Sequence, residues 1–287
     1  MGRAAAAAVI RKAETDTDLE RCVEIFNAAH PDDRIALRDL QTSKGVCLLH
    51  LGSGYAYLSS SSTPGWQYTM VRVEPGARRR GVGKALLGAA IEAARGEGIV
   101  GLVGRVVDPD DEGSRAWAAA CGFRETRQDV ELLRRLRPGD GEVADDIVPM
   151  RAEHLRGVYA VECECVPDVP ATTPMAAEPF ERWHERISGH AVTYVALDGG
   201  RVVGYATLEH LHGQQHRLEH GLTAVLRDHR GRGVATRLKR AQIAWAAEQG
   251  YTELITATDT ANVPMRRVNV KLGYVERLGS IIVELEL

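Results

Sequence analysis

The chain has 287 residues, of which 44% are hydrophobic and 26% are charged, and its formal net charge is −3. This length suits two domains of about 100–200 residues, each able to bury a core. The slightly acidic balance argues against nucleic-acid binding, and no apolar run approaches the roughly 18 residues that cross a membrane.

The cysteines and the N-terminus indicate a cytoplasmic protein. The 5 cysteines are odd in number and include no C-x-x-C pair, which favours reduced thiols. The alanine run Ala4–Ala8 is too short for a signal peptide. We therefore expect an N-terminal tail that leads into a first strand near Val9–Lys12.

The first half alternates helical and strand patterns. Thr17–Glu20 carries a capping pattern before an apolar helical face. Two apolar runs around Gly52-Ser53-Gly54 predict a hairpin. The expected elements are a helix from 17, a helix over 35–40, strands over 46–51, 55–58 and 68–73, a helix over 83–95, a strand over 100–106, a short helix that ends at Gly122, and a strand over 130–136 that closes this half.

Residues 138–142 concentrate turn formers and charge, which predicts a linker. The second half then repeats the order of the first. The expected elements are a strand near 147–150, helices over 153–163 and 179–187, strands over 192–196, 202–208 and 218–226, a helix over 234–249, a strand over 254–257, a short helix over 263–272 and a final strand over 281–287. The alternation predicts two α/β units, residues 1–137 and 143–287, each with a mixed, mostly antiparallel sheet flanked by helices.

A glycine-rich turn occurs twice, each time between a strand pattern and a long helical pattern. Such a turn directs several backbone N–H groups and the positive end of the helix dipole at one spot, which favours phosphate. Neither copy has the Ser or Thr of a Walker loop or the third glycine of the dinucleotide fingerprint. The residues expected to hold a phosphorylated cofactor are Val73, Arg78, Arg79, Arg80, Gly81, Val82, Gly83 and Lys84 in the first copy, and Val225, Arg230, Gly231, Arg232, Gly233, Val234, Ala235 and Thr236 in the second.

The pattern Arg-x-x-Gly-x-Gly/Ala, which starts at Arg78 and again at Arg230, resembles the acyl-coenzyme A loop of the GNAT superfamily of N-acetyltransferases. The stretch from Asn262 to Tyr274 is similar to the second signature of that superfamily. The resemblance implies acetyl-CoA as the cofactor, with Asn262 and Arg266 on a helix beside its pantetheine arm. Asn262 could instead cap this helix, which is the more frequent role of such a residue.

The resemblance also places a general base eleven positions before the first arginine of the loop. In the second half this position is Glu219, which can accept a proton from an ammonium group, and in the first half it is Gln67, which cannot. Glu219 could equally be an exposed edge-strand residue, and Glu209 and His210 are then the next candidates. This asymmetry predicts that the second half carries the chemistry and the first does not.

A tyrosine acts as the acid in many members of the superfamily, four residues before the glycine that ends the short helix. Here those positions are Asn269 and Ala118. Asn269 can hydrogen-bond a departing thiolate, whereas Ala118 can do nothing. Because a thiol has a pKa of about 8–9, its thiolate leaves readily and can take its proton from solvent.

Four histidines, at positions 210, 212, 216 and 220, could share one face of a hairpin. No cysteine or carboxylate completes a familiar zinc spacing. We therefore expect a polar, substrate-facing cluster and no metal.

These features predict an acetyl-CoA-dependent transferase that acetylates the amine of a small molecule, acting as a monomer or homodimer without nucleic acid or membrane. The double-unit layout is similar to that of mycothiol synthases. The alternative is a non-catalytic acyl-CoA-binding module, and Glu219 favours the enzyme over it.

Overall fold

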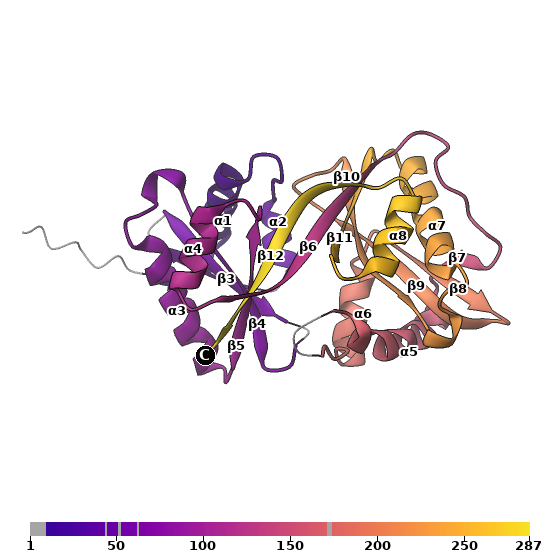
Figure 1. Cartoon of the computed structure of the whole chain (residues 1–287), viewed down its shortest axis with the longest axis horizontal. Coiled ribbons are helices and arrows are strands. Elements are labelled where there is room, and N and C mark those ends of the chain that lie inside the picture. Colours follow the sequence, from indigo (N-terminus) through magenta and orange to yellow (C-terminus); the bar gives the residue numbers. More distant parts are fainter. Residues whose placement is uncertain (1–9, 44, 51–52, 62, 171–173) are drawn as a thin grey trace, which may run out of the picture.

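The computed structural model describes residues 10–287 except 44, 51–52, 62 and 171–173. The expected N-terminal tail, Val9 of the first strand, and Leu51 and Gly52 of the first hairpin lie outside these residues. Figure 1 shows two halves, each a set of helices around part of one sheet, joined by two long strands. No helix in the described ranges has the length and apolar character needed to cross a membrane.

The first half follows the predicted order of elements. Its elements are β1 (Ile10–Lys12), α1 (Asp16–Ala29), α2 (Leu37–Thr42), β2 (Val46–His50), β3 (Gly54–Ser60), β4 (Trp66–Val73), α3 (Val82–Gly96), β5 (Gly101–Val107), α4 (Glu112–Ala120) and β6 (Arg124–Arg135). The cap of α1 is Thr15, not the expected Thr17, because Thr15 and Asp18 form a reciprocal capping box. Helix α2 begins two residues later than expected, since the Asp39 carboxylate accepts from Ala36 N at 2.7 Å.

The second half repeats this order. Its elements are β7 (Ile147–Pro149), α5 (Leu155–Cys165), α6 (Phe180–Ser188), β8 (Val192–Asp198), β9 (Arg201–His210), β10 (Arg217–Val225), α7 (Val234–Glu248), β11 (Glu253–Asp259), α8 (Val263–Lys271) and β12 (Val275–Glu286). The strand order is β1-β2-β3-β4-β5-β12-β6-β11-β10-β9-β8-β7, in one 12-stranded sheet. Among the described residues only β4–β5 and β10–β11 pair in parallel, so the predicted mixed, mostly antiparallel sheet is confirmed.

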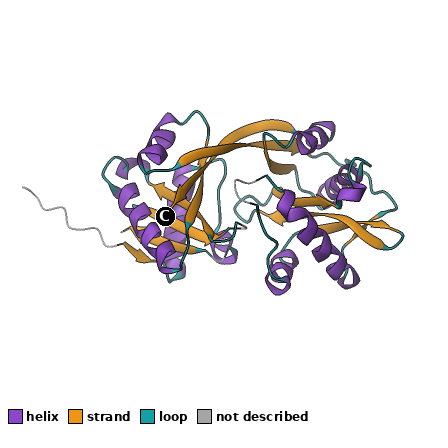
Figure 2. Cartoon of the chain, turned by 60° about the horizontal axis from the view of Figure 1, so that its bottom comes forward, coloured by secondary structure: helices purple, strands orange, loops and turns teal. Residues whose placement is uncertain are grey.

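The last strand of each half crosses to the other half. Residues 280–286 of β12 pair with 101–107 of β5, and residues 129–135 of β6 pair with 253–259 of β11. The two strands also pair with each other, and Figure 2 shows them bridging the halves. The expectation that 130–136 and 281–287 close their own halves is therefore wrong. Both strands carry similar alternation, so the local pattern suits either sheet and does not specify the partner.

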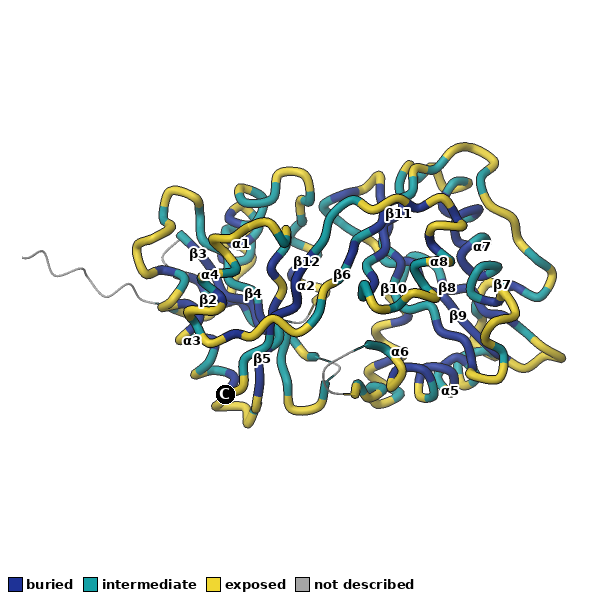
Figure 3. The backbone as a smooth tube through the Cα atoms, in the orientation of Figure 1, coloured by how far each residue is buried: buried dark blue, intermediate teal, exposed yellow. Residues whose placement is uncertain are grey.

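Apolar side chains form separate cores on the two sides of the exchanged strands. The largest cluster lies in the second half and includes Trp183, Tyr205 and Leu238. Figure 3 shows the buried positions along the central strands and the inner faces of the helices. The linker is docked rather than free, because a Cβ on Gly141 would lie 2.4 Å from the backbone N of Ala244 in α7.

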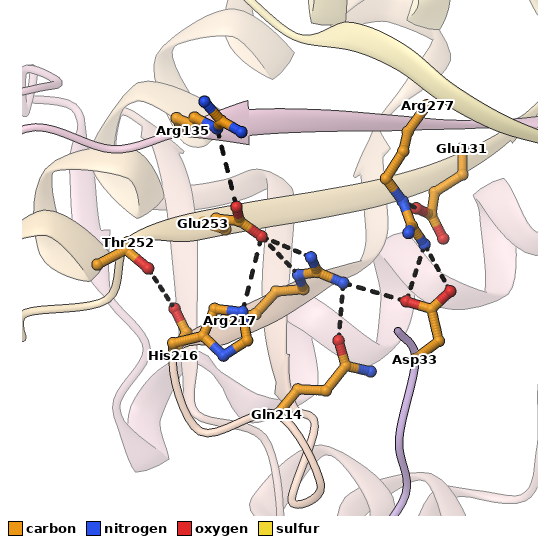
Figure 4. Close-up of polar contacts among 9 residues, drawn as sticks. All are labelled: Asp33, Glu131, Arg135, Gln214, His216, Arg217, Thr252, Glu253 and Arg277. Atoms are coloured by element: carbon orange, nitrogen blue, oxygen red, sulfur yellow. Dashed lines mark hydrogen bonds and ion pairs between the residues drawn. The ribbon is translucent and has the colours of Figure 1, made fainter. Parts of the chain in front are cut away.

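An ionic network joins the first half to the start of β10 (Figure 4). The Asp33 carboxylate accepts from Arg217 at 3.2 Å and from Arg277 of β12 at 2.9 Å. Arg217 also pairs with Glu253 at 2.5 Å, and Arg277 pairs with Glu131 of β6. These contacts fix β10 two residues before Glu219.

Candidate active site

Strand β10 becomes irregular after Glu219, where its pairing with both neighbouring strands is interrupted. Its parallel pairing with β11 ends at Glu219, and its pairing with β9 shifts register between His220 and Thr223. The extra residue is a β-bulge, which leaves backbone groups unpaired and re-aims side chains. Gly221 lies in this bulge, where a Cβ would stand 2.1 Å from Glu209 Oε1, so a larger residue would require the Glu209 side chain to move. We call residues 220–225 the splayed segment.

Glu219 ends the paired part of β10, directly before the splayed segment. It is half-buried, and burial, with the nearby Glu209 carboxylate as a second cause, raises its pKa to about 7. Arg105 of β5 opposes this shift and Glu131 of β6 adds to it. Glu209 is the direct cross-strand partner of Glu219, and burial raises its pKa as well. A carboxyl with a pKa near neutrality can exchange protons at physiological pH.

The first half has no carboxylate at the matching place. Strand β4 pairs with β3 without any register shift. Its third parallel pair with β5 is Tyr68–Val103, and the third pair of β10 with β11 is Glu219–Ile255. The structural counterpart of Glu219 is therefore Tyr68, not Gln67 as counting along the sequence suggested. The bulge in β10 adds one residue before the loop and causes this error.

The two glycine-rich turns have the predicted shape. Gly81 (φ 84°) and Gly233 (φ 76°) are left-handed and directly precede α3 and α7. No side chain in the described part of the chain caps either helix, so their first N–H groups are free to donate to an anion. Val82 and Val234 are buried and anchor the first turns, where Gly83, Lys84, Ala235 and Thr236 follow. Arg79 is left-handed (φ 62°) at the place where the second copy has Gly231.

The leading arginines shape these turns. Arg78 Nε donates to the Val73 carbonyl at 3.2 Å, and Arg230 Nε donates to the Val225 carbonyl at 2.9 Å. Arg230 also pairs with Asp168 at 2.7 Å. Of the cations expected at the cofactor, Arg80 and Arg232 are exposed beside the turns. The contact of any of these residues with a cofactor stays a prediction.

The short helix α8 uses two of its predicted cofactor residues for its own structure. Asn262 caps it by accepting from Met265 N at 3.3 Å, which is the role that frequency favoured. Arg266 pairs with Glu276 at 2.6 Å, as Arg115 pairs with Glu125 at 2.8 Å in α4. The internal repeat thus extends to ion pairs.

Asn269 is fully buried on α8, and neither of its amide atoms has a hydrogen-bond partner within the described residues. Buried amide groups are rarely left unpaired. The unpaired amide is therefore suited to hydrogen-bond a polar cofactor arm that lies against α8. Ala118, its counterpart on α4, offers no such group.

The four hairpin histidines have separate partners and do not form the expected cluster. His210 stacks on His212, and His216 lies 3.8 Å from Glu253. His220 is buried, with its ring nitrogens 3.0 Å from Gln242 Oε1 and 2.5 Å from the Tyr274 hydroxyl. Lys239 of α7 lies over the Tyr274 ring, and burial lowers its pKa to about 7. The sequence pattern of α7 gave no sign of this buried lysine.

A pocket of about 310 Å³ lies beside the splayed segment, between the two halves. Its wall includes Leu222 of the bulge and Ser60 and Ser61 at the end of β3. Its charged residues are Glu162 of α5, Glu178 just before α6, and Arg186 of α6. No sequence motif predicts these residues, because only tertiary packing brings them together.

Comparisons with known proteins agree with this geometry. A tandem GNAT protein from the clavulanic acid biosynthesis pathway is 22% identical, with a TM-score of 0.76 and 97% of each chain covered. A GCN5-related N-acetyltransferase from Sphaerobacter thermophilus is 16% identical, with a TM-score of 0.73 and coverage of 96% of this chain and 95% of that one. No curated protein matches the chain. The model of the acetyltransferase (GNAT) family matches residues 13–123 and 155–274, so the chain belongs to this family and is an acyltransferase with two GNAT units.

Proposed function

We propose that this protein transfers the acetyl group of acetyl-CoA to the amine of a small molecule, with the chemistry in the second half. One observation carries the assignment. Glu219, with its pKa raised to about 7, stands where β10 bulges and parts from β11, whereas the equivalent position of the first half holds Tyr68. A phenol ordinarily keeps its proton at neutral pH and is no base there.

Each step of the transfer has a candidate group. Glu219 takes a proton from the acceptor ammonium, directly or through one water. The amine nitrogen then attacks the thioester carbonyl, whose oxygen accepts from backbone N–H groups on the side of the splayed segment that no longer pairs with β11. The C–S bond breaks and the nitrogen loses its second proton to solvent, while the Asn269 amide donates a hydrogen bond to the departing sulfur, which takes its proton from solvent.

The turn Arg230–Thr236 is the proposed cradle for the pyrophosphate of acetyl-CoA. Its left-handed glycines and the uncapped start of α7 support this role. The arginines Arg230 and Arg232 supply positive charge beside it. Arg266 and Asn262 hold α8 in place next to the pantetheine arm.

The first half is proposed to bind acetyl-CoA through Arg78–Lys84 without turning it over. Tyr68 and Ala118 leave that half without a base and without a partner for the sulfur. We propose that the repeat divides into 1–137 and 143–287, with 138–142 as the linker and the last strands exchanged. The monomeric or homodimeric state and the cytoplasmic location stay predictions.

The direct test is release of free thiol from acetyl-CoA in the presence of a panel of primary amines. We expect thiol release that depends on the amine. Glu219→Gln should lower its rate strongly, whereas Glu92→Gln, a change at an exposed position of α3, should leave it intact. The tandem GNAT protein of the clavulanic acid pathway supports a small-molecule acceptor by its stated context. Binding of acetyl-CoA without amine-dependent release would favour a non-catalytic acyl-CoA-binding module.

A further inference from the structure

The pocket beside the splayed segment contains a charged cluster of two carboxylates and one guanidinium. Arg186 Nη2 pairs with Glu162 Oε1 at 3.0 Å, and Arg186 Nε pairs with Glu178 Oε2 at 2.8 Å. The second oxygen of Glu162 accepts from the buried Tyr205 hydroxyl. We call Glu162, Glu178 and Arg186 the acidic triad.

The acidic triad carries a surplus negative charge. Both carboxylates share the single guanidinium, and the pocket wall holds no other cation in the described part of the chain. Glu162 is buried and fully hydrogen-bonded, but Glu178 has one oxygen without a partner among the described residues. A carboxylate oxygen in this position accepts readily from an ammonium group.

The surrounding surface reinforces this charge. Glu209 and Glu219 lie opposite each other on β9 and β10, on the face that holds Gly221 of the bulge. The nearby His190 is 3.6 Å from Glu209 but carries no compensating charge at neutral pH, because burial lowers its pKa to about 4. Leu222 of the bulge lines the same pocket as the triad. The pocket that holds the triad therefore adjoins the splayed segment three residues beyond Glu219.

We infer that the acceptor carries, besides the amine that is acetylated, a second cationic group that binds the Glu162–Glu178–Arg186 triad. The acceptor class is thus a diamine, a polyamine or an amino sugar with more than one ammonium group. This inference rests on the proposed function. Anionic acceptors are disfavoured, because Arg186 is already shared by two carboxylates and like charges repel in a partly desolvated site.

A series of equal chain length isolates the second charge. Putrescine, 4-amino-1-butanol and 4-aminobutyrate present the same primary amine with a cationic, neutral or anionic end, and spermidine extends the cationic member. Thiol release gives kcat/KM for each, and calorimetry with the acetyl-CoA-loaded protein measures binding independently of turnover. We expect putrescine or spermidine to exceed the amino alcohol by about tenfold or more, which is the effect of one charge-assisted contact.

The matched variants are Glu178→Gln and Glu181→Gln. The first removes the charge of Glu178 but keeps an oxygen that accepts from Arg186, and should erase most of the preference for diamines while leaving the amino alcohol unchanged. The second removes a charge from an exposed position of α6, the helix that follows Glu178 and carries Arg186, and should alter neither. Thermal unfolding of each variant checks that it folds, and the wild-type series stands as a test without them.

The outcomes separate the two proposals. Equal handling of putrescine and 4-amino-1-butanol overturns the second cation but supports acetyl transfer. Binding of a diamine that depends on Glu178, without acetylation of any amine, supports the cationic site and counts against the proposed reaction. Failure of both putrescine and spermidine to bind the loaded protein overturns this inference.

Discussion

Replacing Glu219 by glutamine removes the proposed base and keeps its shape. An acceptor amine with a pKa near 9 is only about 1% unprotonated at pH 7, so the uncatalysed loss of its proton limits the rate. Removing a general base typically costs 10²–10⁴-fold. We expect Glu219→Gln to lower kcat by about this factor at pH 7, with acetyl-CoA affinity almost unchanged.

The pKa of Glu219 determines how the activity should change with pH. Glu219 acts when ionised, and its pKa is about 7, so wild-type activity should rise with pH through that value. Below pH 6 the wild type loses its base to protonation, and above pH 9 the free amine forms without help. The gap between wild type and Glu219→Gln should therefore be widest near pH 7–8 and narrow on both sides.

Glu219→Gln should raise the free energy of unfolding, although it lowers the activity. Raising the pKa of this carboxyl from an ordinary value of 4.5 to about 7 penalises the ionised folded state. The penalty is absent below pH 4.5, where the group is protonated in both states, and is complete above pH 7, where it reaches about 3 kcal/mol. Glu219→Gln should thus be more stable than the wild type at pH 8 by up to about 3 kcal/mol, with a smaller difference at pH 5.

Steady-state thiol release between pH 6 and 9 and urea unfolding at pH 5 and 8 test both parts. Glu92→Gln controls for the loss of a charge. A near-normal kcat for Glu219→Gln across this range would pass the role of base to Glu209, to a hairpin histidine or to no residue. A stability difference that does not vary with pH would refute the argument from burial.

Three further changes test the loops and the sheet. Gly233→Asp should abolish acetyl-CoA binding to the second half in calorimetry, because it puts a carboxylate where N–H groups face phosphate; Gly233→Ala, which shares the strain of φ 76°, should retain much of it. Gly81→Asp should leave most turnover intact but reduce thermal stabilisation by acetyl-CoA, and loss of turnover with circular dichroism unchanged would reverse the assignment of the halves. A fragment of residues 1–137 should fold poorly because β5 lacks β12, and a peptide of residues 275–286 should restore its helical circular dichroism; a fragment that is stable alone would contradict the role of the exchanged strand.

Much of the fold could be predicted because its signals are local. Apolar periodicity located the helices, and Gly81 and Gly233 marked the turns because each needs a left-handed backbone before a helix. The partner of a strand is not a local property. Strands β6 and β12 have patterns that fit either half, so their exchange could be found only in three dimensions.

The candidate site was predicted in part for the same reason. Glu219 lies at a fixed distance from a recognisable loop, and the structure places it beside an irregular strand. The bulge at Gly221 adds one residue between Glu219 and the loop, so the structural counterpart of Glu219 is Tyr68 and not Gln67. The acidic triad and Lys239 left no motif, since their surroundings come from helices and strands far apart in the sequence.

The exchange of strands explains why a half without a base is still part of the proposed site. Glu131 of β6 raises the pKa of Glu219, and Arg105 of β5 opposes it. Asp33 holds Arg217 two residues before Glu219, and Ser60 lines the proposed acceptor pocket. All four residues belong to the first half of the sequence. The second half alone would keep its cofactor turn but lose the charges that tune its base and one wall of its pocket, so the first half supports the reaction by placing charge and not by performing chemistry.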